Sequence, residues 1–135
     1  MIVDLDDRNK SKFIAELKEL LDACNPRPDA HFVLAVEEGE AWLLGDFDAV
    51  KTAYPRAKTA VLDSYEYDSI CGTWELLADA VYPGGHETLK QLGYSLIGKE
   101  KCAWANNITE VMSMSKNNSP SFQHFIKTLT LYIRF

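Results

Sequence analysis

Turn-forming stretches cut this chain into short segments, and they limit its fold more than any other feature of the sequence. Residues 25–28 hold two prolines, residues 83–85 form a Pro-Gly-Gly turn, and residues 116–121 are mostly Asn, Ser and Pro. Proline and glycine interrupt regular structure through their unusual backbone properties. Every apolar run between these turns is far shorter than the roughly 20 residues that cross a bilayer. With 135 residues, 47% of them hydrophobic, the chain is expected to form a single globular domain over residues 1–135.

Five segments carry apolar residues at the three- and four-residue spacing of an amphipathic helix. In the first of them, Phe13, Leu17 and Leu21 lie on one side of the predicted helix. Asp46 is placed to cap the start of the second helix, and Gly93 to end the fourth. We therefore predict helices over residues 8–24, 46–54, 70–81, 86–93 and 99–114.

Four other segments are typical of strands. Residues 30–36 form a short apolar run, and residues 41–44 return after a turn, as in a hairpin. Residues 59–62 are a third apolar run, and residues 129–135 alternate between apolar and polar side chains, which predicts a half-exposed terminal strand. The expected fold class is α+β: a single domain with a small mixed β-sheet of about four strands covered by helices, in the order α-β-β-α-β-α-α-α-β.

Charge and cysteine content limit the cellular compartments and the classes of partner that can be expected. The chain has 20 acidic and 14 basic residues and a net charge of −6, which argues against binding nucleic acid through phosphate neutralisation. Its first residues are acidic where a signal peptide needs basic ones. Three cysteines, an odd number, stand far apart in the sequence, which favours reduced thiols. We expect a cytoplasmic protein without membrane association.

The acidic residues are concentrated in the middle of the chain. Residues 29–87 hold twelve acids and three bases. Acids crowd a predicted hairpin tip at residues 37–40 and mix with tyrosines in residues 63–69. Carboxylates beside aromatic side chains suit a surface that attracts and holds a basic protein partner. The predicted partner-binding residues are Glu37, Glu38, Glu40, Trp42, Asp63, Tyr65, Glu66, Tyr67 and Asp68.

A structural interpretation of these acids is also open. Turns and helix starts are commonly acidic, and Asp68 is placed to interact favourably with the start of a helix. On this interpretation the charged segments are only a solvated surface.

Three patterns come close to catalytic or binding motifs. Residues 93–100 fit the phosphate-binding loop G-x-x-x-x-G-K-[ST] except that Glu100 replaces the hydroxyl residue, and a predicted helix precedes them instead of a strand. Cys71 near a helix start and His86 after the Pro-Gly-Gly turn could form a nucleophile and its base. The histidines and cysteines lack the close spacing of a zinc site, so we predict no metal and no cofactor.

These observations favour a protein-interaction module over an enzyme, although they leave enzymatic activity open. The predicted function is an acidic, cytoplasmic module that binds a basic protein surface, in the manner of immunity proteins, antitoxins and small inhibitors. The alternative is a small hydrolase or ligand-binding domain that uses Cys71 and His86. A third possibility is a subunit of a larger complex that pairs through the open edge of the terminal strand.

Overall fold

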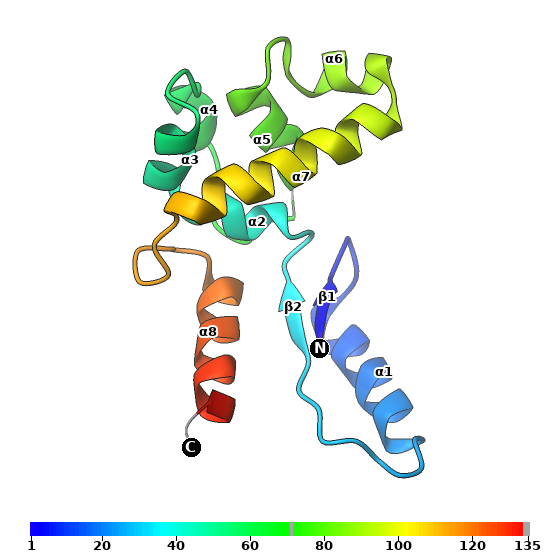
Figure 1. Ribbon diagram of the computed structural model, residues 1–135. Helices are drawn as coiled ribbons and strands as arrows, with labels where there is room; N and C mark the ends of the chain where they lie inside the picture. Colours follow the sequence, from blue (N-terminus) through cyan, green and yellow to red (C-terminus); the bar gives the residue numbers. More distant parts are fainter. Residues whose placement is uncertain (71, 134–135) are drawn as a thin grey trace.

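The computed structural model describes residues 1–70 and 72–133, and in this part of the chain it contains eight helices and two strands (Figure 1). In chain order they are β1 (Ile2–Asp4), α1 (Lys10–Asp22), β2 (Val33–Ala35), α2 (Glu40–Leu43), α3 (Phe47–Ala53), α4 (Thr59–Asp63), α5 (Thr73–Val81), α6 (Gly85–Leu92), α7 (Tyr94–Val111) and α8 (Pro120–Ile133). Helices α2 to α7 form one body. The β1-α1-β2 unit and α8 extend from it on the same side (Figure 1).

The predicted α+β fold with a four-stranded mixed sheet is wrong. Within the described residues the only sheet has two strands, β1 and β2, which run parallel with Val3 opposite Leu34. Parallel neighbours need a crossover connection, and α1 supplies it. Strand β1 was not predicted from the sequence, because three residues are too few to display a period.

Three predicted strands are helices in the structure. Residues 41–44 fall largely in α2, and residues 59–62 lie in α4. An apolar run of four residues fits a strand or a buried helical turn equally well, so periodicity could not separate the two. The described part of the predicted terminal strand, up to Ile133, belongs to α8.

The alternation at the end of the chain wrongly predicted a strand, because it covers only the exposed end of a longer helix. Leu131 and Ile133 are 71% and 59% exposed, whereas Phe122, near the helix start, is buried. The threonines of this alternating segment donate hydrogen bonds from their hydroxyl groups to carbonyls of the same helix. Thr128 donates to the carbonyl of His124 at 2.9 Å and Thr130 to that of Ile126 at 2.7 Å.

The five predicted helices are confirmed as α1, α3, α5, α6 and α7, with shifts at their ends. The predicted cap of α3 is also confirmed, because Asp46 Oδ1 accepts a 3.0 Å hydrogen bond from the Ala49 N–H. Gly93, with a φ of 103°, ends α6 as predicted and also precedes α7. Its left-handed backbone lets the chain reverse between the two helices.

The described residues form two separate hydrophobic cores. The larger one lies inside the helical body and includes Leu44, Leu77 and the fully buried Trp104. The smaller one joins α1 to the sheet through Leu5, Phe13 and Leu34. Because the β1-α1-β2 unit has its own core, its position relative to the helical body depends on polar contacts between them.

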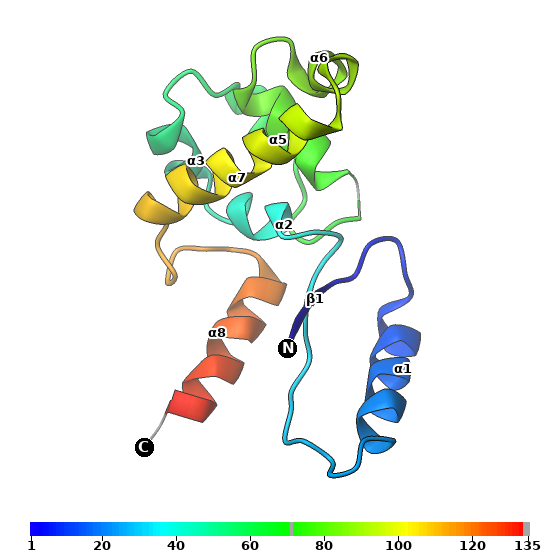
Figure 2. The same cartoon turned by 45° about the vertical axis from the view of Figure 1, so that its right-hand side comes forward.

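Helix α8 lies on the opposite side of β2 from α1 (Figure 2). The loop before α8 is fixed on the helical body. The Asn118 N–H donates to the Gly45 carbonyl at 2.8 Å, and Asn117 Nδ2 donates to the Trp42 carbonyl at 2.7 Å. The predicted linker at residues 116–121 is therefore an ordered joint that sets the direction of α8.

Candidate functional site

Most of the acids in the central segment are directed into the molecule. Seven of the twelve acids of residues 29–87 are buried or half-buried: Glu37, Glu38, Glu40, Asp46, Asp68, Glu75 and Asp79. The acidic turn after β2 is not a hairpin tip, because α2 begins at Glu40. A protein-binding surface made of all the predicted acids therefore does not exist as one exposed patch.

Glu37 caps the start of α5. Its Oε1 accepts a 2.7 Å hydrogen bond from the Gly72 N–H, and its Oε2 accepts a 2.6 Å bond from the Thr73 N–H. A carboxylate at a helix start satisfies backbone donors that have no partner in the helix and interacts favourably with the helix dipole. Glu37 thus ties the end of β2 to the helical body.

Glu38 and Glu40 share one counter-ion, Lys101 of α7. The Lys101 ammonium group lies 2.7 Å from Glu38 Oε2 and 3.3 Å from Glu40 Oε2. Burial raises the pKa of Glu40, although Lys101 opposes this shift. Burial also raises the pKa of Asp4 at the end of β1, and the charges of Glu38 and Asp6 add to the effect. Burial acts to lower the pKa of Lys101, but its hydrogen bond to Glu38 and the neighbouring carboxylates raise it overall.

Asp68 caps α8, which starts more than fifty residues later in the chain. Its Oδ1 accepts a 2.6 Å hydrogen bond from Ser119 Oγ, and its Oδ2 accepts a 2.6 Å bond from the Ser121 N–H. Trp42 holds the same helix, because its Nε1 donates to Ser121 Oγ at 2.8 Å and its ring stacks on Phe125 at 5.2 Å between centroids. Asp68 and Trp42, both predicted to contact a partner, therefore hold α8 in place.

The other predicted contact residues divide between the core and the surface. Tyr65 is buried, and Tyr67 is half-buried with its ring against Phe47 at 5.4 Å. Asp63 and Glu66 are exposed and remain available to a partner.

The alternative site at Cys71 and His86 is only partly visible, since Cys71 lies outside the described residues. His86 Nδ1 lies 2.8 Å from Asp79 Oδ1, and its Nε2 lies 2.9 Å from Glu87 Oε1. Both ring nitrogens thus contact a carboxylate, which leaves neither free to activate a nucleophile in this arrangement. Partial burial opposes the shift, but hydrogen bonds from His86 hold the pKa of Asp79 below its ordinary value. These contacts fix the first turn of α6.

The structure also shows where the near-match to a phosphate-binding loop lies and bears on metal binding and membrane spans. Residues 94–100 lie inside α7, so the near-match to a phosphate-binding loop is helical. Over the described ranges, no three His, Cys, Asp or Glu side chains are grouped to hold a metal ion. No helix found there has the length and apolar character needed to cross a membrane.

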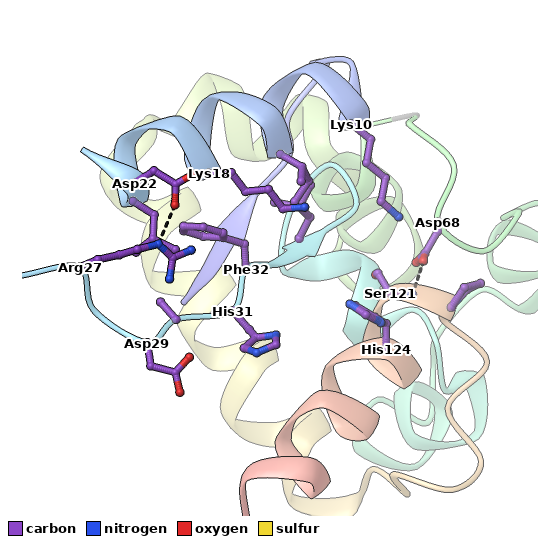
Figure 3. Close-up of a pocket in the computed structure, with 15 residues that line it drawn as sticks. Lys10, Lys18, Asp22, Arg27, Asp29, His31, Phe32, Asp68, Ser121 and His124 are labelled. Carbon is purple, nitrogen blue, oxygen red and sulfur yellow. Dashed lines mark hydrogen bonds and ion pairs between the residues drawn. The ribbon is translucent and has the colours of Figure 1, made fainter. Parts of the chain in front are cut away.

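A groove of about 900 Å³ lies between α1 and α8 (Figure 3). One wall is α1, with Lys10, Ile14 and Lys18, and the other is the start of α8, with Ser121 and His124. Between the walls lie residues 29–32, which lead into β2, and Leu34 within it. The volume is that of a site able to hold a small molecule or part of a peptide.

The hydrogen bonds of the sheet show which edge of β2 is free. The Val33 N–H donates to the Met1 carbonyl at 2.9 Å, and the Leu5 N–H donates to the Ala35 carbonyl at 3.0 Å. Val33 and Ala35 therefore turn their backbone groups toward β1. The backbone groups of the intervening residue point to the other edge, because a strand directs successive residues to opposite sides.

Leu34 and Phe32 supply the backbone groups of this outer edge, and both residues line the groove. No hydrogen bond to the backbone N–H or C=O of either residue is present within residues 1–70 and 72–133. A buried backbone group without a partner is costly. The groove therefore contains a strand edge whose N–H groups can donate and whose C=O groups can accept further hydrogen bonds.

No family model, no curated protein and no solved structure matches this chain.

The groove was not predicted from the sequence. His31 and His124, which belong to no motif in the sequence, both line it. The groove is formed by three segments that lie far apart in the chain, and no local pattern links them. The one available signal was the lysine spacing on the first helix, where Lys10, Ile14 and Lys18 recur every four residues.

Proposed function

We propose that this protein is a protein-interaction module that binds an extended peptide segment of a partner as a third strand on the outer edge of β2. The observation that carries the proposal is the set of unpaired backbone groups at Phe32 and Leu34 inside a groove. Addition of a strand to an exposed sheet edge is a recurring mode of peptide recognition. Main-chain hydrogen bonds supply affinity, and the walls select side chains.

The small size of the sheet supports this mode. Two strands are marginal on their own, and parallel strands are ordinarily covered by helices on both faces. Here α1 and α8 flank β2, but within the described residues no third strand pairs with its outer edge. An incoming strand would extend the sheet between two helices that are already in place, so little reorganisation would oppose binding.

The groove also supplies apolar contacts for such a strand. Ile14 and Leu21 line it from α1, and Phe32 from the segment before β2. Phe32 is half-buried, so its ring keeps surface that a bound peptide can cover. Burial of apolar surface contributes roughly 25 cal/mol per Å², which adds to the backbone hydrogen bonds.

A synthetic peptide tests the proposal through its backbone. The probe is a capped peptide of about eight residues that alternates valine and threonine, long enough for one strand. Two derivatives carry N-methyl groups on alternate residues, one derivative on the odd positions and the other on the even positions. In a bound strand only one of these sets faces β2, so one derivative should lose binding and the other should retain it.

Two variants of the protein locate the binding in the groove. Ala30→Trp places a large side chain in the groove lining, and Ala15→Trp places the same side chain on an exposed position of α1 outside it. Fluorescence anisotropy of a labelled probe should show weaker binding to Ala30→Trp only. Equal binding of both N-methylated derivatives, or no loss with Ala30→Trp, would show that the peptide does not add to β2.

A further inference from the structure

We infer that the groove selects an acidic segment, with carboxylates four residues apart on the side that faces α1. This inference rests on the proposed strand addition and names the chemistry of the partner at the same site. It is carried by the arrangement of Lys10, Ile14 and Lys18 along the α1 wall.

The two lysines have free charges. Among the described residues, neither Lys10 nor Lys18 takes part in an ion pair within 4.0 Å. By contrast, Arg27, which also lines the groove, is 2.6 Å from Asp22. A bound carboxylate can therefore pair with Lys10 or Lys18 without displacing another carboxylate, as it would have to at Arg27.

The position of Lys10 adds to the positive potential at one end of the groove. Lys10 is the first residue of α1, and the first turn of that helix has no acidic residue. Helix starts carry a partial positive charge, so a lysine there is unfavourable for the helix alone and favourable for a bound anion. The start of α8 lies at the same end of the groove, where Lys10 extends toward Ser121 and His124 (Figure 3).

The acids that line the groove compete little with a ligand. Both carboxylate oxygens of Asp68 already accept hydrogen bonds at the start of α8, and Asp22 is paired with Arg27. Asp29 lies at the far end of the groove from Lys10 (Figure 3). The lining as a whole balances three acids with three bases, but among the described residues no carboxylate lies within 4.0 Å of the Lys10 or Lys18 ammonium group.

The spacing along α1 matches the repeat of a strand. Lys10 and Lys18 are eight helical residues apart, which corresponds to about 12 Å along the axis. Residues four apart in a strand face the same side and are separated by about 13 Å. Two acidic side chains at the first and fifth positions of a segment can therefore reach Lys10 and Lys18, and an apolar third residue would contact Ile14 between them.

Three capped probe peptides of equal length test this inference. The first has glutamate at the first and fifth positions and valine at the third. The second replaces both glutamates with lysine, and the third keeps two glutamates but moves them to the second and fourth positions. We expect the first peptide to bind about tenfold more tightly than the second, as two solvated ion pairs allow. The third should bind more weakly than the first because its carboxylates are too close together.

Charge reversal on the protein should reverse this order. Lys10→Glu combined with Lys18→Glu should favour the lysine peptide, whereas Lys12→Glu, on the same helix outside the groove, should leave the order unchanged. Equal binding of the three peptides, with one N-methylated derivative still inactive, would overturn the acidic selection and leave strand addition intact. Failure of all three peptides to bind while the valine-threonine probe still binds would overturn the acidic selection alone, and failure of that probe as well would overturn both proposals.

Discussion

The Lys101 ammonium group of α7 lies 2.7 Å from Glu38 Oε2, in the turn that connects β2 to α2. This ion pair joins the helical body to the turn after β2, the strand that borders the groove, while the 3.3 Å contact to Glu40 of α2 lies within the helical body. Because the sheet has its own small core, this polar joint is one of the contacts that fix its orientation.

Replacement of Lys101 should therefore destabilise the protein. Lys101→Met leaves Glu40, whose side chain is 9% exposed, without its counter-ion. We expect the free energy of unfolding to fall by about 1–3 kcal/mol, the range for loss of a hydrogen-bonded partner to a buried polar group. Urea unfolding of Lys101→Met and of the exposed control Lys99→Met measures this. Equal stability of the two variants would contradict a structural role for the pair.

The pH dependence of stability should report on Glu40. Burial raises the pKa of Glu40 in the folded state above its ordinary value of 4.5. Between pH 4.5 and that folded-state pKa, the folded state binds more protons than the unfolded state. The contribution of Glu40 to stability must then decrease as the pH rises through this window, whereas Asp79, with its lowered pKa, contributes in the opposite direction. Asp4, with a raised pKa above 3.8, acts in the same direction as Glu40. Glu40→Gln should make the decrease shallower in urea unfolding measured at several pH values. An unchanged slope would show that Glu40 does not contribute to it.

Lys101 should make the stability of the protein depend on pH in the alkaline range as well. Its pKa is raised above 10.5, so its stabilising contribution is complete below that value and is lost as the pH rises through the folded-state pKa. The Lys101→Met variant should lack this alkaline loss. Thermal unfolding between about pH 10 and 12 compares the two proteins, and an identical alkaline loss in the variant would assign it to other groups.

Asp68 should control the order of α8. Asp68→Asn keeps a residue that tolerates the φ of 59° at this position, but it replaces one charged acceptor with an amide donor. We expect a loss of about 1–2 kcal/mol, as for other helix caps. Amide exchange in the first turn of α8 should become faster than in the matched control Glu66→Gln, which changes an exposed side chain. No difference between the variants would indicate that Asp68 does not cap α8 in solution.

Trp42 should secure α8 through two separable contacts. Trp42→Phe keeps an aromatic ring beside Phe125 and removes the donor to Ser121, for an expected loss of about 1 kcal/mol. Trp42→Ala removes both contacts and should cost about 3 kcal/mol, the lower part of the range for aromatic truncations because Trp42 is half-buried. Urea unfolding followed by circular dichroism measures both. Tyr94→Ala, at a position 92% exposed, should have no effect. Equal losses for Trp42→Phe and Trp42→Ala would show that ring packing contributes nothing.

The sequence predicted the elements whose signal is local. Helices with several turns repeat their apolar residues often enough to show a period, and the caps at Asp46 and Gly93 depend on neighbouring residues. The short elements at residues 41–44 and 59–62 were assigned wrongly, since four residues do not distinguish a strand from a helical turn. The terminal alternation failed for a related reason, because it was considered without the rest of α8.

The roles of the acids could not be predicted, because their partners lie far away in the sequence. Glu37 accepts hydrogen bonds from residues 35 and 36 positions later, and Asp68 from residues 51 and 53 positions later. Composition predicted an acidic surface, but only tertiary structure shows that these carboxylates cap helices. The groove likewise combines α1, the approach to β2 and α8, and depends on how the chain brings them together.

Backbone amide exchange at β2 is the most direct test of strand addition, because it examines the outer edge of the strand with and without a bound peptide. In the free protein, the amides of Val33 and Ala35 should exchange slowly, since they face β1, while the intervening Leu34 amide should exchange faster. Saturation with the acidic probe peptide should slow exchange at Leu34 and leave Val33 and Ala35 nearly unchanged. A Leu34 amide that is as protected as Ala35 in the free protein, or that gains no protection from the bound peptide, would contradict strand addition at this edge.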